Sequence, residues 1–392
     1  MIELTGEQEN LVKEAVKWYK NSSEQVFQYS GSAGTGKSVV MNAIIQRLGL
    51  DITEVAPMSY IGAAVIIMRL KGLINAKTAH SWLFEPVWEE SDEMDGYLNR
   101  PKKKMVFVPR ELPPEKKLIC IDEAGCIPMN LKSEIEGRGL KVLACGDLNQ
   151  LPPVMDNPAY LYTGPVRYLT QIMRQNSKSG IIYLANRILN NEIIMPGHYG
   201  NAMVLEHDQI TDSIISNSEV VICGKNATRE KFNKYIRQKL FGFNTVLPNY
   251  GEKLVCRKNN WAKEVDGINL ANGLIGIVSN QPEPTTFDGK TFMINFLPTM
   301  QSNPFVNVKC DYKYFVGDTE DRKRIKLSPY YPGEKFEYAY AVTTHISQGA
   351  QYGTGIYFKE YLNESVNRNL DYTGITRFSK GCFFFIPKRK FF

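Results

Sequence analysis

The sequence lacks long hydrophobic runs, a secretion signal and any cysteine pattern typical of zinc binding. No apolar run approaches the roughly 18 residues that a membrane-spanning helix needs. The first residues have neither the basic nor the apolar segment of a signal peptide. The seven cysteines are scattered and show no paired two-residue spacing. We therefore expect a cytoplasmic protein without membrane association, whose cysteines are buried free thiols.

The charge of the chain is not extreme in either direction. The formal net charge is +6, and 22% of the residues are charged. This balance is compatible with a polyanionic partner but does not require one. With 392 residues, of which 43% are hydrophobic, the chain can form two or three domains with separate cores.

A glycine-rich stretch carries the clearest chemical signal. Residues 31–38 read GSAGTGKS and match the phosphate-loop pattern of Gly, four residues and Gly-Lys-Ser. Residues 25–30 alternate like a strand, and residues 39–45 form an apolar run typical of a helix. A turn between a strand and a helix is the context in which such a loop binds phosphate, whereas a plain glycine-rich surface turn needs neither flank.

Each residue type in this loop has a distinct role. The backbone N–H groups of Gly34, Thr35 and Gly36 can point at phosphate oxygens, supported by the helix N-terminus. In this pattern Lys37 reaches the β and γ phosphates, and the Ser38 hydroxyl ligates Mg²⁺. The loop thus predicts a site for ATP with Mg²⁺.

Polar residues follow two predicted strands further along. Residues 117–121 form an apolar run that ends in Asp122 and Glu123, and residues 141–145 lead to a loop containing Gln150. The carboxyl ends of parallel strands are where α/β sheets place their ligands. We expect Asp122 to bind Mg²⁺, Glu123 to orient or deprotonate the attacking water, and Gln150 to sense the γ phosphate. The alternative for the two carboxylates is a charged surface turn.

These motifs, in this order, resemble those of superfamily 1 helicases, most of all the RecD-like and Dda-like subgroup of bacteria and their phages. Residues 169–175, 339–349 and 371–377 resemble the fourth, fifth and sixth motifs of that family. The resemblance implies that Arg174 and Arg377 contact the γ phosphate across a cleft between two domains. It also implies a set of residues that bind the nucleotide, namely Gln8, Gly34, Thr35, Gly36, Lys37, Ser38 and Gly349. Gln8, whose amide can read an adenine edge, can equally be a surface glutamine.

The same resemblance implies a set of residues that contact DNA. They are Pro57, Tyr60, Thr78, His80, Ser81, Thr343, Thr344 and His345. The chain departs from the family at Ile346, where relatives usually have lysine, and after Pro57, where they usually have threonine. For His80, the alternative is a capping or core histidine.

The expected fold is α/β, with two RecA-like domains that are P-loop-type parallel sheets. Residues 1–165 are expected to form the first, ATP-binding domain, with a β-hairpin or wedge inserted at 84–114. The second domain is expected to comprise 166–250 and 333–392. Short alternating runs without helical periodicity predict a small β-barrel at 251–332, and the resemblance implies that this barrel is SH3-like.

The function implied by the resemblance is that of an ATP-dependent DNA helicase. It would move on single-stranded DNA, 5′ to 3′ as relatives do, and unwind duplexes and forks by hydrolysing ATP in the cleft between the two RecA-like domains. We expect a compact monomer of phage or bacterial type in the cytoplasm of a bacterium or an infected host, with replication or recombination proteins as possible partners. A P-loop small-molecule NTPase or kinase is the alternative enzyme. An ATP-switched DNA-binding clamp without processive unwinding is the alternative binding module.

Overall fold

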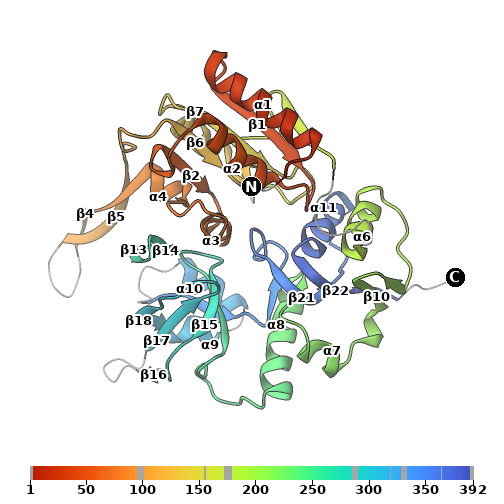
Figure 1. Cartoon of the computed structure of the whole chain (residues 1–392). Coiled ribbons are helices and arrows are strands. Elements are labelled where there is room, and N and C mark those ends of the chain that lie inside the picture. Colours follow the sequence, from red (N-terminus) through yellow and green to blue (C-terminus); the bar gives the residue numbers. More distant parts are fainter. Residues whose placement is uncertain are drawn as a thin grey trace.

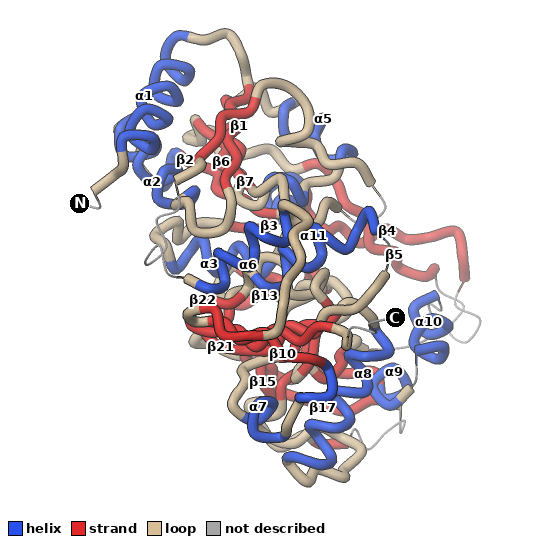
Figure 2. Tube along the Cα trace, turned by 90° about the vertical axis from the view of Figure 1, so that its right-hand side faces the viewer, coloured by secondary structure: helices blue, strands red, loops and turns tan. Residues whose placement is uncertain are grey.

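Three sheets organise the chain, and each has its own core (Figure 1). The computed structural model describes residues 3–94, 101–153, 156–171, 179–284, 290–317, 319–327, 333–362 and 364–388. Seen from the side, the first sheet and its helices form one half of the molecule, and the other two sheets form the other half (Figure 2).

The first sheet contains six parallel strands in the order β3-β2-β6-β7-β1-β8. Alternate residues of its central strands face two different cores: Leu118 and Cys120 lie in one, Ile119 and Ile121 in the other. Helices cover both faces, so these strands are apolar on both sides. The elements of this unit are α1 (Gly6–Asn21), β1 (Val26–Gly31), α2 (Lys37–Leu48), η1 (Ile52–Glu54), β2 (Val55–Ser59), α3 (Gly62–Leu70), β3 (Lys77–Thr78), α4 (Ala79–Leu83), β6 (Leu118–Ile121), η2 (Ala124–Cys126), η3 (Met129–Leu131), α5 (Lys132–Glu136), β7 (Lys141–Gly146) and β8 (Val166–Leu169).

The second sheet has the order β20-β11-β21-β22-β10-β9, and only β9 is antiparallel to its neighbour. It provides the second RecA-like unit, as the sequence predicts. Its elements are α6 (Gly180–Leu189), β9 (Gly197–Tyr199), β10 (Ala202–Glu206), η4 (His207–Gln209), α7 (Asp212–Ser216), β11 (Val221–Cys223), α8 (Asn226–Tyr235), η5 (Ile236–Leu240), β20 (Ala341–Thr343), β21 (Tyr352–Phe358), α11 (Glu364–Ile375) and β22 (Phe378–Ile386).

The third sheet is antiparallel and lies where a small β-barrel is predicted. The region also contains two short helices, α9 and α10, which the alternating runs of the sequence do not indicate. Residues 319–327 are mostly polar and show no apolar stripe, although Ile325 among them is buried. The elements of this region are β12 (Lys253–Cys256), β15 (Ile275–Val278), β16 (Glu283–Pro284), β17 (Thr291–Pro298), β18 (Phe305–Asp311), α9 (Tyr312–Val316), α10 (Thr319–Leu327) and β19 (Phe336–Tyr338). Strands β13 (Asn260–Val265) and β14 (Ile268–Leu270) form a separate two-stranded sheet.

Two strands lie across the boundaries expected from the sequence. Strand β8 pairs with β1, so the first sheet extends beyond residue 165. Strand β19 pairs with β12, so the third sheet takes a strand from the segment after residue 332. A hairpin of β4 (Phe84–Met94) and β5 (Pro101–Pro109) extends away from the first sheet, as predicted for 84–114 (Figure 1).

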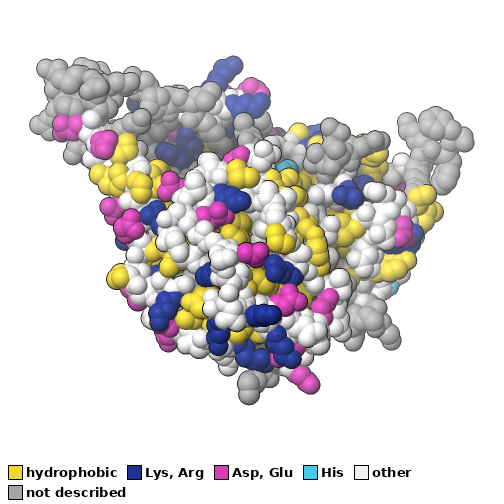
Figure 3. Space-filling model, turned by 90° about the horizontal axis from the view of Figure 1, so that it is seen from above, with side chains coloured by type: hydrophobic (Ala, Val, Ile, Leu, Met, Phe, Trp, Pro, Cys, Tyr) yellow, Lys and Arg dark blue, Asp and Glu magenta, His cyan; other side chains and the backbone are white. Residues whose placement is uncertain are grey.

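The surface and the cysteines agree with the composition. All seven cysteines are buried and free, which confirms the prediction of buried thiols. On the face shown in Figure 3, basic and acidic side chains are interspersed and do not form a single basic patch. No helix in the described part of the chain is long and apolar enough to cross a lipid bilayer.

A buried ion cluster fastens the third sheet to the second unit. Glu337 on β19 is paired with Arg229 on α8, and Arg257 Nε lies 3.4 Å from Glu337 Oε1. The Tyr314 hydroxyl donates to the same carboxylate at 2.9 Å. Burial alone would raise the pKa of Glu337, but the charges of Arg257, Arg229 and Arg322 outweigh it and lower the pKa to about 2.

Replacing Glu337 by alanine leaves buried guanidinium groups without their partner. We expect Glu337→Ala to lower the free energy of unfolding by about 3–5 kcal/mol at pH 7, measured by urea denaturation. Because the pKa is about 2 in the folded chain against an ordinary 4.5, the stabilisation is complete above about pH 4.5 and is lost as the pH falls towards 2. The exposed Glu24→Ala serves as control, and equal losses in both variants would contradict the assignment.

Candidate active site

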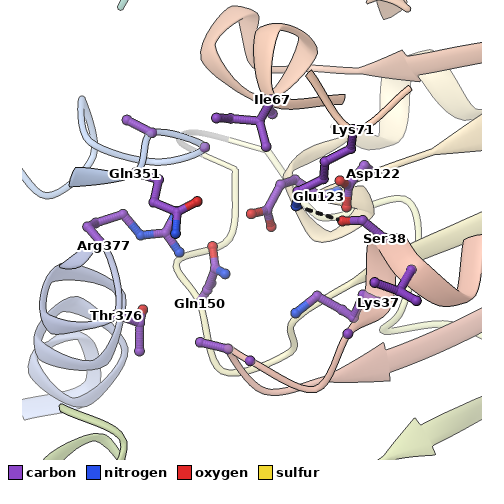
Figure 4. Close-up of a pocket in the computed structure, with 17 residues that line it drawn as sticks. Lys37, Ser38, Ile67, Lys71, Asp122, Glu123, Gln150, Gln351, Thr376 and Arg377 are labelled. Atoms are coloured by element: carbon purple, nitrogen blue, oxygen red, sulfur yellow. Dashed lines mark hydrogen bonds between the residues drawn. The ribbon is translucent and has the colours of Figure 1, made fainter. Parts of the chain in front are cut away.

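A cavity of about 320 Å³ lies between the two RecA-like units. Figure 4 shows Lys37, Ser38 and Asp122 on one side of it and Arg377 on the other. The predicted site residues that line it are Gly34, Gly36, Lys37, Ser38, Asp122, Glu123, Gln150, Gly349 and Arg377. The fold therefore brings together residues that are far apart in the sequence.

The loop after β1 has the backbone that its glycines permit. Gly34 has φ 90° and Gly36 has φ 83°, both in the left-handed region. The Lys37 ammonium donates to the carbonyl oxygens of Gly31 at 2.7 Å and Ser32 at 3.3 Å. The lysine is thus held against the loop, at the N-terminus of α2, where phosphate oxygens are favoured.

Gln8 packs against this loop from α1. Its Nε2 donates to the Thr35 carbonyl at 3.0 Å, and its Oε1 accepts from the Thr5 N–H at 3.1 Å. A Cβ on Gly36 would lie 2.5 Å from Gln8 Nε2, so glycine is needed for this close approach. Gln8 and Thr35 are buried beside the cavity, and the reading of adenine by Gln8 stays a prediction.

Asp122 and Glu123, the two acidic residues that follow β6, have different environments. Asp122 Oδ1 accepts from the Glu123 N–H at 2.9 Å and from Cys145 Sγ at 3.3 Å. Glu123 has φ 52°, a conformation that costs free energy in a non-glycine residue and is often found at functional sites. Burial raises the pKa of Glu123, against the lowering effect of the Arg377 charge. A carboxylate with a raised pKa is suited to accept a proton.

The donor set fits a Mg²⁺-bound triphosphate. Ser38 and Asp122 both line the cavity and offer hard oxygen ligands, and Mg²⁺ typically takes one or two protein ligands together with phosphates and waters. Gln150 Oε1 is buried and has no hydrogen-bond partner among the described residues. A buried amide oxygen without a partner costs free energy, so a water at this place would satisfy it.

Tyr372, on α11, joins the second unit to two loops of the first. Its hydroxyl donates to Asp147 Oδ2 at 2.6 Å and accepts from the Ala33 N–H at 3.0 Å. Ala33 belongs to the phosphate loop, and Asp147 follows β7. Further hydrogen bonds across the same boundary link Leu151 with Thr373, Asn369 with Gln150, and Gln348 with Leu151.

The two arginines of the predicted site differ in what the structure describes. Arg377 follows α11, is buried, and donates through Nε to the Thr373 carbonyl at 3.1 Å. Arg174 lies outside the described residues. Sequence reasoning missed Lys71, which lines the cavity and donates to Ser38 Oγ at 3.1 Å (Figure 4). A single lysine after a helix carries no motif signal.

The residues expected to contact DNA differ in exposure and in the contacts they make. Tyr60 is 40% exposed, and its ring centroid lies 5.7 Å from that of His80, which lies 5.4 Å from Trp261 on β13. Burial lowers the pKa of His80. The other expected contacts fall into three kinds: His345 is exposed, Thr78 and Ser81 bond one another, and Pro57, Thr343 and Thr344 are enclosed.

The enclosed residues correct the expectation of direct DNA contact. The Pro57 carbonyl accepts from Trp82 Nε1 at 2.8 Å within the core of the first unit. Thr344 has no exposed surface, and both its N–H and its hydroxyl donate to the Cys223 carbonyl. These residues lie at the ends of strands, and their side chains are not exposed for contact with DNA.

A protein-family model for an AAA domain matches residues 3–204, which include the phosphate loop and both carboxylates. The chain belongs to the AAA domain family. Bacteroides Pif1, solved bound to single-stranded DNA, has a similar fold with a TM-score of 0.58 at 17% sequence identity, covering 98% of this chain and 92% of that one. The family model and this likeness of fold agree with the expected architecture of two RecA-like units.

Two longer proteins also match in sequence. The ATP-dependent DNA helicase RRM3 of Saccharomyces cerevisiae is 29% identical over 165 residues, which are 38% of this chain and 21% of that protein. An uncharacterized protein of Methanocaldococcus jannaschii is 23% identical over 435 aligned residues, which are 92% of this chain and 36% of that protein. The matched segments therefore span about a third of the Methanocaldococcus protein and about a fifth of RRM3.

Removing the Tyr372 hydroxyl isolates its part in holding the two units together. We expect Tyr372→Phe to lower the free energy of unfolding by about 1.5–3 kcal/mol, because a hydrogen bond to a charged group is lost. Urea denaturation measures the change. Tyr361→Phe, at a 65% exposed tyrosine, should change it by less than about 0.5 kcal/mol. No difference between the two variants would contradict the linkage.

Proposed function

We propose that the protein is an ATP-dependent DNA helicase that translocates on single-stranded DNA. The observation that carries the proposal is the cavity between the two RecA-like units. The phosphate loop and the carboxylates line it from one unit, and Arg377 lines it from the other. A nucleotide bound there contacts both units, so its hydrolysis can change how they sit against each other.

The residues of this cavity can perform phosphoryl transfer to water. The loop N–H groups and Lys37 would hold the phosphates, and Glu123 would accept the proton of a water oriented by the free Gln150 oxygen. Mg²⁺ held by Ser38 and Asp122 would supply charge neutralisation at the phosphates. Arg377 would stabilise the charge of the transition state, a role worth about 10³ to 10⁵ in rate.

The hydrogen bonds across the cavity suggest how chemistry becomes motion. Tyr372 contacts both the phosphate loop and Asp147, so a shift of the loop on ATP binding reaches α11 directly. Alternate closing and opening of the units would step the protein along a strand that each unit grips in turn. A small-molecule NTPase has no need for such a link.

The DNA path is proposed from the exposed candidates. Tyr60, His80 and Trp261 offer neighbouring rings on which unpaired bases can stack. The β4–β5 hairpin extends beside them as a wedge for a fork. We propose movement 5′ to 3′ and a monomeric enzyme in the cytoplasm of a bacterium or an infected host, with replication or recombination proteins as partners. These proposals rest on the resemblance to the RecD-like and Dda-like subgroup.

Steady-state ATP hydrolysis with and without single-stranded DNA tests the proposal. We expect DNA to stimulate hydrolysis at least about tenfold, and Lys37→Ala and Arg377→Ala to abolish the stimulated rate. Lys17→Ala and Arg368→Ala, on the surface of α1 and on α11, are the matched controls. Rapid hydrolysis indifferent to DNA would favour a small-molecule NTPase, and slow hydrolysis with ATP-dependent DNA binding would favour a switched clamp.

Glu123 can be separated from nucleotide binding. We expect Glu123→Gln to lower kcat by about 10²- to 10⁴-fold, since the amide cannot accept the proton. ADP affinity should stay within about twofold, because the amide is isosteric and the loop is intact. Glu115→Gln, at an exposed glutamate, is the control. Equal activity of Glu123→Gln and the unmodified chain would remove Glu123 from the mechanism.

A further inference from the structure

Lys71 is a cation in the nucleotide cavity that no motif accounts for. It follows the C-terminal end of α3 and lines the cavity with Lys37, Ser38 and Glu123. Its Nζ donates to Ser38 Oγ at 3.1 Å, the one dashed contact in Figure 4. The Lys71 carbonyl accepts from Asn42 Nδ2 on α2 at 2.8 Å, so the lysine is fixed to the same helix that carries Ser38.

The oxygen that Lys71 contacts is the proposed ligand for the divalent cation. A serine hydroxyl has two lone pairs and one proton, and it can accept from an ammonium or ligate Mg²⁺. Lys71 is exposed, but an ammonium about 3 Å from this oxygen would lie close to a bound Mg²⁺, and two such positive charges repel each other. The contact seen and metal ligation by Ser38 therefore compete.

We propose that Lys71 is a positioning residue that competes with Mg²⁺ for Ser38. It holds the Ser38 hydroxyl until the metal arrives, and the ammonium then moves from that oxygen towards the phosphates. In the absence of metal, the same ammonium supplies positive charge to a bound diphosphate. This inference rests on the proposed function, because it takes the cavity as a site for nucleotide and Mg²⁺.

The position of α3 is set by contacts with the third sheet and with the second unit. Arg69 donates to the Ala76 carbonyl at 2.7 Å and to the Gly267 carbonyl at 2.7 Å, in the turn between β13 and β14. A Cβ on Gly349 would lie 3.1 Å from Ala64 Cβ, so the second unit also packs closely on α3. Helix α3 therefore places Lys71 with reference to all three sheets.

Equilibrium binding of a fluorescent ADP, followed by anisotropy during a Mg²⁺ titration, tests the inference on the full chain. Without Mg²⁺, we expect Lys71→Met to bind ADP about tenfold more weakly, because the ammonium no longer meets the phosphates. The Mg²⁺ concentration at half-maximal binding should fall about tenfold, because the competitor for Ser38 is gone. Lys71→Arg keeps the charge and should restore ADP binding without Mg²⁺. Lys17→Met, on the surface of α1, should match the unmodified chain.

The outcomes separate this inference from the proposed function. If the unmodified chain and Lys71→Met bind ADP with the same Mg²⁺ dependence, the inference is overturned and the nucleotide site stands. If Lys71→Arg loses ADP binding without Mg²⁺ as Lys71→Met does, charge is not the cause and the inference is again overturned. If the unmodified chain binds no ADP under any condition, the proposed function fails and the inference fails with it.

Discussion

The hydrogen bonds of Tyr372 place a single hydroxyl between the phosphate loop and the loop that follows β7. Both loops are ends of parallel strands in the first sheet, and the tyrosine comes from the second unit. A polar group buried at such a junction must find partners, since an unsatisfied one costs about 1–3 kcal/mol. The two units therefore cannot separate here without breaking these bonds. The cavity therefore keeps its shape only while the two units stay together.

Much of the nucleotide site could be predicted because its residues follow buried strands. Asp122 and Gln150 come at the ends of apolar runs, and parallel strands bring their carboxyl ends to one edge. The positions of Lys71 and Trp261 could not be predicted in this way, since each depends on how separate units pack. Strand β21 was also missed, because glycines at 353 and 355 interrupt its alternation. Sequence periodicity predicts the individual helices and strands. The packing of the units against each other decides which side chains from different units meet.

Arg377 and the expected DNA contacts also differ in how well the sequence predicts them. The sequence pattern around Arg377 predicts a residue at the cavity, and the turn after α11 brings it there. The residues expected to contact DNA include both exposed and enclosed side chains. A motif of short polar residues can cap a helix as readily as it can bind a phosphate, so the motif alone does not tell the two roles apart. Thr78 accepts from the Ser81 N–H as the N-cap of α4, which is a structural task. Exposure, which no single sequence reports, is what distinguishes Tyr60 and His345 from Pro57 and Thr344.

Helix α3 explains how a change at one site can reach the others without a long pathway. Its buried face contributes Ile66 to the core of the third sheet, and Ile67 lines the nucleotide cavity one residue later. Arg69 holds the turn of β13 and β14, which carry Trp261 and the Asn269 oxygen that accepts from Ser81. A strand at Tyr60 and His80 and a phosphate near Ser38, both as proposed, would lie near opposite ends of α3, and a helix of this length moves as a rigid body. Coupling between DNA and nucleotide then needs only that both ligands prefer the same position of α3.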